Sequence, residues 1–161
     1  MTSRVTQRGE FSSQLFDERS FYTAFVEDLT RCRSEVIIES PFISKSRLQS
    51  LLPELQRLIE KQIPVYIMTK DPSLLDYPLA HHSESAIQAF ETLGIQVYVT
   101  RNEHHRKLAI LDRQILWEGS LNILSQTKSR EIMRRIESMQ HAQEMFDFLQ
   151  WGTRIRQTGD K

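Results

Sequence analysis

Apolar residues recur along the first hundred residues in an alternating order of helix and strand. Helical spacing of apolar residues predicts helices at 17–31, 46–61 and 83–93, and short β-branched runs predict strands at 35–40, 65–69 and 95–100. We expect Asp17 to cap the helix at 17–31 and Ser83 to cap the helix at 83–93, which Gly94 then ends. Pro53 predicts a kink in the second helix or a short turn before it. This alternation is typical of an α/β sandwich, with a mixed, largely parallel sheet and helices on both faces.

The last third of the chain departs from this order. Two apolar runs at 107–112 and 115–119 are separated by almost nothing, which predicts a hairpin with Arg113 and Gln114 near its turn. A further strand is possible at 131–137, and a helix is predicted at 140–155. Residues 1–12 are polar and aperiodic, so we expect a flexible N-terminus followed by one domain at 13–161.

Composition narrows the class of protein. With 161 residues, 39% hydrophobic and 26% charged, the chain is typical of one soluble domain, and no apolar stretch is long enough to cross a bilayer. The N-terminus lacks the apolar run of a signal peptide, so we expect a cytoplasmic protein. Cys32 is the only cysteine, which excludes an intrachain disulfide and favours a buried thiol. Zero net charge argues against a protein that coats nucleic acid by bulk electrostatics.

Polar residues stand at the start of the first strand of the hairpin and after the end of the second. His105 and Lys107 stand two apart at the start of the first strand, so both side chains leave the sheet on the same side. Ser120 and Asn122 have the same spacing after the second strand. Pairing of the two strands would bring the start of one beside the end of the other. The sequence therefore predicts that these four side chains converge.

Such a group suits the chemistry of a phosphodiester. A histidine ring nitrogen can attack phosphorus, a lysine ammonium can stabilise the negative charge of the transition state, and a hydroxyl and an amide supply neutral donors. This set requires no metal and no other cofactor. His81 and His82 could ligate a metal, but the sequence offers no evident third ligand. His104 is expected to be a flanking surface residue, and Trp117 and Trp151 to lie in the core.

The segment from 105 to 122 resembles the signature of the phospholipase D superfamily, H-x-K-x4-D followed by G-S-x-N. The residues that match are His105, Lys107, Asp112, Gly119, Ser120 and Asn122. The resemblance implies a phospholipase D-like catalytic domain, in which histidine forms a covalent phosphohistidine and a second histidine protonates the leaving oxygen. The family uses two signatures per active site and this chain has one. It is similar to the small single-motif nucleases, which form two-fold dimers with a composite site.

The resemblance also implies roles for individual residues. His105, Lys107, Asp112 and Glu131 form the catalytic set. Within it, Glu131 is the candidate that fixes the histidine tautomer, and Asp112 is expected to hold the hairpin and the interface together. Lys107, Ser120 and Asn122 bind phosphate by the same comparison. Three further basic residues near the motif, Arg106, Lys128 and Arg130, are candidates for a substrate-binding rim.

Three functions remain open at this point. The first is a metal-independent endonuclease that cuts DNA or RNA, with nucleic acid and a second copy of the chain as partners. The second is a phospholipid phosphodiesterase or transphosphatidylase, which requires an apolar channel or a membrane-facing surface that the sequence does not show clearly. The third is a catalytically silent module that binds nucleic acid. The intact His105, Lys107, Ser120 and Asn122 argue against the third.

Overall fold

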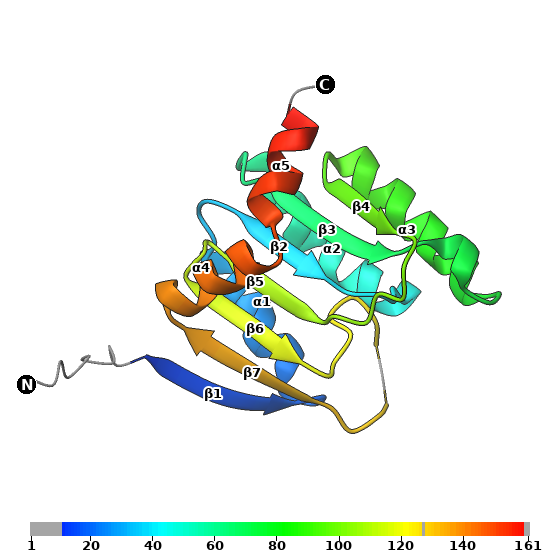
Figure 1. Ribbon diagram of the computed structural model, residues 1–161. Coiled ribbons are helices and arrows are strands. Elements are labelled where there is room, and N and C mark those ends of the chain that lie inside the picture. The colour runs from blue at the N-terminus through cyan, green and yellow to red at the C-terminus, as the bar shows by residue number, and fades with distance from the viewer. Residues whose placement is uncertain (1–10, 127, 160–161) are drawn as a thin grey trace, which may run out of the picture.

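The computed structural model describes residues 11–126 and 128–159, which form a seven-stranded sheet between two layers of helices (Figure 1). The expected flexible N-terminus lies outside the described residues up to position 10, and Ser12 already belongs to a strand. The strands are β1 (Ser12–Asp17), β2 (Val36–Glu39), β3 (Val65–Lys70), β4 (Gln96–Thr100), β5 (Leu108–Leu111), β6 (Ile115–Gly119) and β7 (Ile132–Glu137). The helices are α1 (Phe21–Arg31), α2 (Lys45–Glu60), α3 (Leu79–Leu93), α4 (Met139–Phe148) and α5 (Trp151–Gly159), with a 3-10 turn at Pro72–Leu74.

The sheet has the order β1-β7-β6-β5-β2-β3-β4. Both the mixed sheet and the helices on its two faces confirm the expected α/β sandwich. The expectation of a largely parallel sheet is corrected, because only β2–β3 and β3–β4 are parallel among the described pairs and the other four pairs are antiparallel. The hairpin and the strands beyond it cause the difference, since short connections join antiparallel neighbours.

One edge of the sheet consists of a strand that the sequence pattern did not predict. β1 pairs with β7 along its whole length, and its first four residues are exposed. Asp17 ends this strand and does not cap a helix. Its carboxylate accepts hydrogen bonds from the backbone of Arg19 and Ser20, and α1 begins only at Phe21. An exposed edge strand has no buried face, so it lacks the apolar alternation on which a strand prediction depends.

The remaining helices differ from the prediction mainly at their ends. Ser44 caps α2 by accepting a hydrogen bond from the backbone of Arg47, and Pro53 lies inside the helix. α3 begins before Ser83, whose side chain is buried, and it ends at Gly94 with the expected left-handed backbone (φ 95°). The helix expected at 140–155 is two helices, α4 and α5, separated where Gln150 adopts a φ of 58°.

The hairpin between β5 and β6 turns one residue earlier than expected. Asp112 and Arg113 both adopt left-handed backbone angles, with φ values of 53° and 49°, and the backbone of Gln114 donates to the carbonyl of Leu111. These features are those of a two-residue type I′ turn, whose twist matches that of antiparallel strands. The turn therefore fixes the register of β5 against β6, and with it the relative position of the motif residues at the other end.

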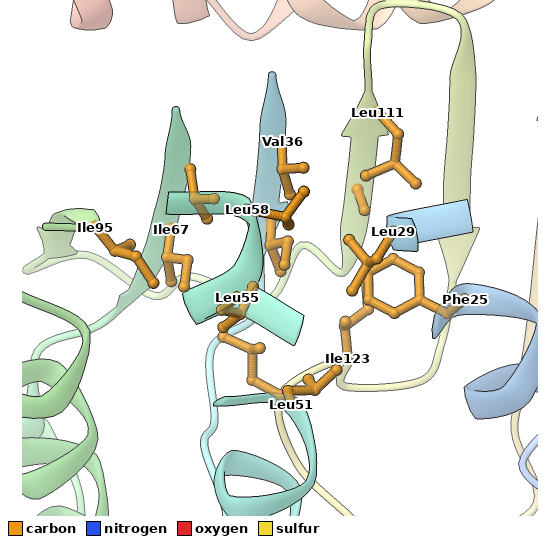
Figure 2. Packing of buried hydrophobic residues seen from close by; sticks show 14 of the residues in the cluster. Phe25, Leu29, Val36, Leu51, Leu55, Leu58, Ile67, Ile95, Leu111 and Ile123 are labelled. Atoms are coloured by element: carbon orange, nitrogen blue, oxygen red, sulfur yellow. The ribbon is translucent and has the colours of Figure 1, made fainter. Parts of the chain in front are cut away.

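Two apolar clusters hold the layers together. The larger one lies between the sheet and α1, α2 and α3; Figure 2 shows Leu58 of α2 near Val36 and Ile67 of the strands, and Leu51 beside Ile123. The smaller cluster lies between the opposite face and α4 and α5. Trp117 and Trp151 are fully buried, one in each cluster, which confirms their expected place in the core. Cys32 is also buried, and burial raises the pKa of its thiol to about 12, as expected of an unreactive thiol.

Candidate active site

The segments that carry His105 and Lys107 and that carry Gly119 and Ser120 meet at the edge of the sheet where the parallel strands end. Leu108 at the start of β5 lies opposite both Glu39, the last residue of β2, and Glu118 near the end of β6. The backbone of Gly119 donates to the carbonyl of Lys107 at 3.4 Å. The segment carrying His105 and Lys107 therefore abuts the segment that carries Ser120, as the sequence predicted. In α/β sheets, the crevice outside the carboxyl ends of the strands is the usual place for a ligand.

His105 and Lys107 lie in the irregular segment that leads into β5. The His105 side chain is exposed, and its ring stands edge-on to Phe42 with 6.3 Å between the ring centroids. Lys107 is partly exposed, and its Nζ donates to the carbonyl oxygen of His105 at 2.7 Å. The ammonium is thus held against the backbone of the candidate nucleophile while the His105 ring stays accessible.

Ser120 and Asn122 follow β6 and differ in how their polar atoms are used. The Ser120 hydroxyl accepts a hydrogen bond from the backbone of Ile132 at 3.1 Å, so β7 fixes its position. The Asn122 Oδ1 atom is buried and has no hydrogen-bond partner within residues 11–126 and 128–159. A buried acceptor without a partner is uncommon and costs stability, which makes Asn122 a group that a ligand or a second chain could satisfy.

The other residues expected near the site remain predictions in their roles. Glu131 directly precedes β7, and its backbone donates to the Glu18 carboxylate at 3.0 Å. Within the described residues, the Glu131 carboxylate makes no hydrogen bond to His105. Its role in fixing the tautomer of the histidine stays a prediction. Lys128 and Arg130 are exposed in the connection before β7.

Asp112 lies at the other end of β5 from His105. Its carboxylate accepts hydrogen bonds from the backbone of Arg33, Ser34 and Glu35 and from the Ser34 hydroxyl. Burial alone would raise the pKa of Asp112, but these N–H donors outweigh it and lower the pKa below its usual range. This position corrects the inclusion of Asp112 in the catalytic set: the residue holds the hairpin, as expected, by fastening it to the segment before β2.

Sequence reasoning missed a buried carboxylate beside the motif. Glu39 is fully buried and accepts hydrogen bonds from Arg106 Nε at 2.7 Å, from Arg106 Nη2 at 3.3 Å and from Trp151 Nε1 at 3.0 Å. The guanidinium expected at the substrate rim is therefore paired with a buried carboxylate, although the Arg106 side chain is 45% exposed. His104, expected at the surface, is only 7% exposed and corrects that expectation. The available signal was the glutamate itself, because a charged residue in a buried strand requires a partner.

A metal site does not emerge from the arrangement of the residues. His81 and His82 are neighbours on α3 with ring centroids 6.3 Å apart, and they line a cavity of about 270 Å³. The described part of the chain contains no group of three or more histidine, cysteine, aspartate or glutamate side chains that could hold an ion. Independence from metals therefore remains a prediction for experiment. None of the described helices is long and apolar enough to cross a membrane.

Comparison with known proteins decides the family. The model of the family described as "Cardiolipin synthase, PLD-like domain" matches residues 25–151. The chain belongs to this family of PLD-like domains. Members of the family are typically phosphodiesterases. No curated protein matches the chain.

Solved structures agree with this assignment at the level of the fold. The PLD-like chain is similar to the phospholipase D family member Nuc from Salmonella typhimurium, with a TM-score of 0.71 and 18% identity over 88% of this chain and 93% of that one. NucT from Helicobacter pylori gives 0.68 and 18% over 88% and 94%. A phosphatidylserine synthase from Haemophilus influenzae gives 0.66 and 14% over 95% of this chain and 40% of its own. Identities this low show a shared fold and leave the substrate open.

Proposed function

We propose that this PLD-like domain is a metal-independent endonuclease that hydrolyses DNA or RNA through a phosphohistidine intermediate, in a site shared between two copies of the chain. The observation that supports the proposal is the backbone contact between Lys107 and Gly119, which joins the segment of the accessible His105 ring and the Lys107 ammonium to the segment that carries Ser120. These side chains are a nucleophile and charge-stabilising donors for a phosphodiester.

Each step of the reaction has a group to perform it, on this chain or on a second copy of it. A His105 ring nitrogen attacks phosphorus, forming a phosphorus–nitrogen bond as the bond to the leaving oxygen breaks. A second histidine protonates that oxygen and then removes a proton from the water that hydrolyses the phosphohistidine. Lys107, Ser120 and the Asn122 amide bind the phosphate oxygens throughout.

The second histidine must come from another copy of the chain. His104 is the nearest candidate in sequence, but it is buried. Burial, together with the positive charges of Arg106 and Lys107, lowers the pKa of His104 to about 4, so its ring is neutral at neutral pH and cannot serve as the general acid. In a two-fold dimer, His105 of each copy faces the same phosphorus.

Two considerations favour a nucleic acid as the substrate. Nuc and NucT match this chain over nearly their whole length, whereas the phosphatidylserine synthase matches over less than half of its own. Residues 101–161 also hold 11 lysines and arginines against 8 acidic residues, which favours an anionic polymer at this end of the chain.

A phospholipid is the second candidate substrate, because an apolar groove adjoins the site. The groove of about 500 Å³ is lined by Lys107 and Gly119 and by the exposed apolar side chains of Leu15, Ile132 and Phe148. Such a surface can accept an acyl chain or cover part of a second protein. A catalytically silent nucleic-acid-binding module is the third candidate, and the absence of turnover in the experiment below would favour it.

The test is incubation of the purified chain with labelled single- and double-stranded DNA, RNA and phospholipid vesicles in excess EDTA. The proposal expects cleavage of a nucleic acid that persists in EDTA and a phosphorylated, acid-labile adduct during turnover. Activity that chelation abolishes and Mg²⁺ or Zn²⁺ restores would contradict the phosphohistidine mechanism. Turnover of phospholipid alone would replace the nuclease by the second candidate.

A further inference from the structure

The segment that carries both catalytic candidates has no regular secondary structure of its own. Residues 101–107 connect β4 to β5 without belonging to a helix or strand. A nucleophile must nevertheless be held within a fraction of an ångström of its productive position, because small misplacements cost large factors in rate. Contacts from outside the segment must therefore fix it.

Successive residues of this segment contact different parts of the protein. The His105 ring faces Phe42, in the connection between β2 and α2. His104 and Arg106 face Glu39, which lies two residues beyond Ile37 on the face covered by α4 and α5. The catalytic side chain is thus exposed beside Phe42, while its two neighbours are held by the buried carboxylate.

Glu39 is suited to hold them because it has no contact with solvent. Its carboxylate is 0% exposed, and it faces the Arg106 guanidinium, the Trp151 indole N–H and the His104 ring. Since His104 is neutral at neutral pH, its Nε2 at 3.6 Å from Glu39 does not form an ion pair, and Arg106 alone neutralises the carboxylate. A buried ion pair of this kind contributes little net stability but specifies one arrangement of the groups that form it.

We propose that Glu39 is a positioning residue, which holds the His105–Lys107 segment in its reactive geometry through the bidentate Arg106 pair and the Trp151 hydrogen bond. This inference rests on the proposed phosphodiesterase function. Glu39 cannot touch a substrate, because it lies beneath Arg106 and has no exposed surface. Its effect on turnover must therefore pass through the segment.

The chain supplies a matched control at the opposite end of the same strand pair. Arg113 donates to Glu35 from Nε at 2.7 Å and from Nη2 at 3.2 Å, nearly the same geometry as Arg106 on Glu39. This second pair lies beside the β5–β6 turn, away from His105. Changes at the second pair report what the loss of an arginine–glutamate pair does without any effect on the reactive segment.

The experiment compares Glu39→Gln, Arg106→Met, the double variant of both, and the control Glu35→Gln. Turnover, KM, thermal stability and hydrogen exchange of peptides covering 104–107 are measured for each. We expect Glu39→Gln to lower kcat about 10- to 100-fold while KM changes less than about threefold, and to accelerate exchange in 104–107. Glu35→Gln should change none of these three quantities beyond about twofold.

The double variant separates positioning from stability. Removing both charges leaves no unpaired buried charge, so the melting temperature should recover toward that of the wild type while kcat stays low. Recovery of kcat together with the melting temperature would overturn the proposal, as would normal turnover and unchanged exchange in a folded Glu39→Gln. If the wild type cleaves no phosphodiester, the proposed function fails, whereas faster exchange in Glu39→Gln would still support the anchoring of the segment.

Discussion

At each end of the β2–β5 strand pair, an arginine donates two hydrogen bonds to a glutamate. The arginine side chains are similarly exposed, 45% for Arg106 and 43% for Arg113. Their partners differ, because the Glu39 side chain is fully buried whereas the Glu35 side chain is 12% exposed. At the turn end, Asp112 binds three successive backbone N–H groups. At the motif end, the His105 ring is exposed, and the Asn122 oxygen and the His104 Nε2 atom have no hydrogen-bond partner among the described residues.

This difference separates stability from chemistry within one strand pair only four residues long. The turn end is satisfied by its own chain, so changes there should affect folding. At the motif end, buried contacts to Glu39 hold the segment while the His105 ring stays exposed, as a site that receives a substrate requires. The signature of the family therefore contains residues of two kinds, and the following predictions separate them.

The largest effect is expected at the motif end. His105→Asn should lower turnover by about 10³-fold or more, because it removes the nucleophile on which the covalent step depends. Its melting temperature should stay close to that of the wild type, since the His105 side chain is exposed. Steady-state cleavage assays and thermal denaturation measure the two quantities. Near-normal turnover in this variant would remove His105 from the mechanism.

At the turn end, the expected effect is on stability. Asp112→Ala should lower the free energy of unfolding by about 2–4 kcal/mol at neutral pH, because several backbone N–H groups lose a charged acceptor. Urea denaturation measures this loss. A variant that keeps its stability but loses turnover as completely as His105→Asn would return Asp112 to the catalytic set.

The same residue predicts a dependence of stability on pH. Since folding lowers the pKa of Asp112 below its usual value of 3.8, the stability that its carboxylate contributes is present above that value and is lost as the pH falls through the folded-state pKa. The difference in unfolding free energy between the wild type and Asp112→Ala should therefore shrink below about pH 4. A difference that stays constant from neutral to acidic pH would show that the carboxylate charge contributes nothing.

The two ends also differ in how far the sequence predicted them. Spacing of the motif residues was enough to predict that the segment of His105 and Lys107 meets the segment of Ser120, because strand pairing and side-chain alternation are local rules. Glu39 and Trp151 lie 112 residues apart, and no local rule connects them. The burial of His104 beside Glu39 could not be predicted for the same reason. The edge strand β1 escaped prediction for a related reason, since only its partner β7 makes it a strand.

A smaller effect on turnover is expected from a change at Trp151, the first residue of α5. Trp151→Phe removes the indole donor to Glu39 but keeps an aromatic ring in the core, and the Arg106 pair remains. We expect kcat to fall about three- to tenfold, with KM and the melting temperature little changed. Combination with Glu39→Gln should add almost nothing, because both changes affect the same hydrogen bond. Independent, additive losses would show that Trp151 acts by packing alone.

The smallest expected effect tests whether the motif end is incomplete in one chain. The wild type is mixed with His105→Asn in equal amounts, with exchange of subunits verified by mass spectrometry of tagged chains. If each site needs His105 from both copies, random pairing puts half of the wild-type chains into inactive heterodimers, and activity per wild-type chain falls about twofold. The matched control is Glu35→Gln mixed with wild type, which alters the turn end and should leave activity per chain unchanged. Unchanged activity in the first mixture, or full activity of a monomer in sedimentation, would show that one chain carries the whole site. The proton donor would then have to be sought within that chain, where the burial of His104 already argues against its nearest histidine.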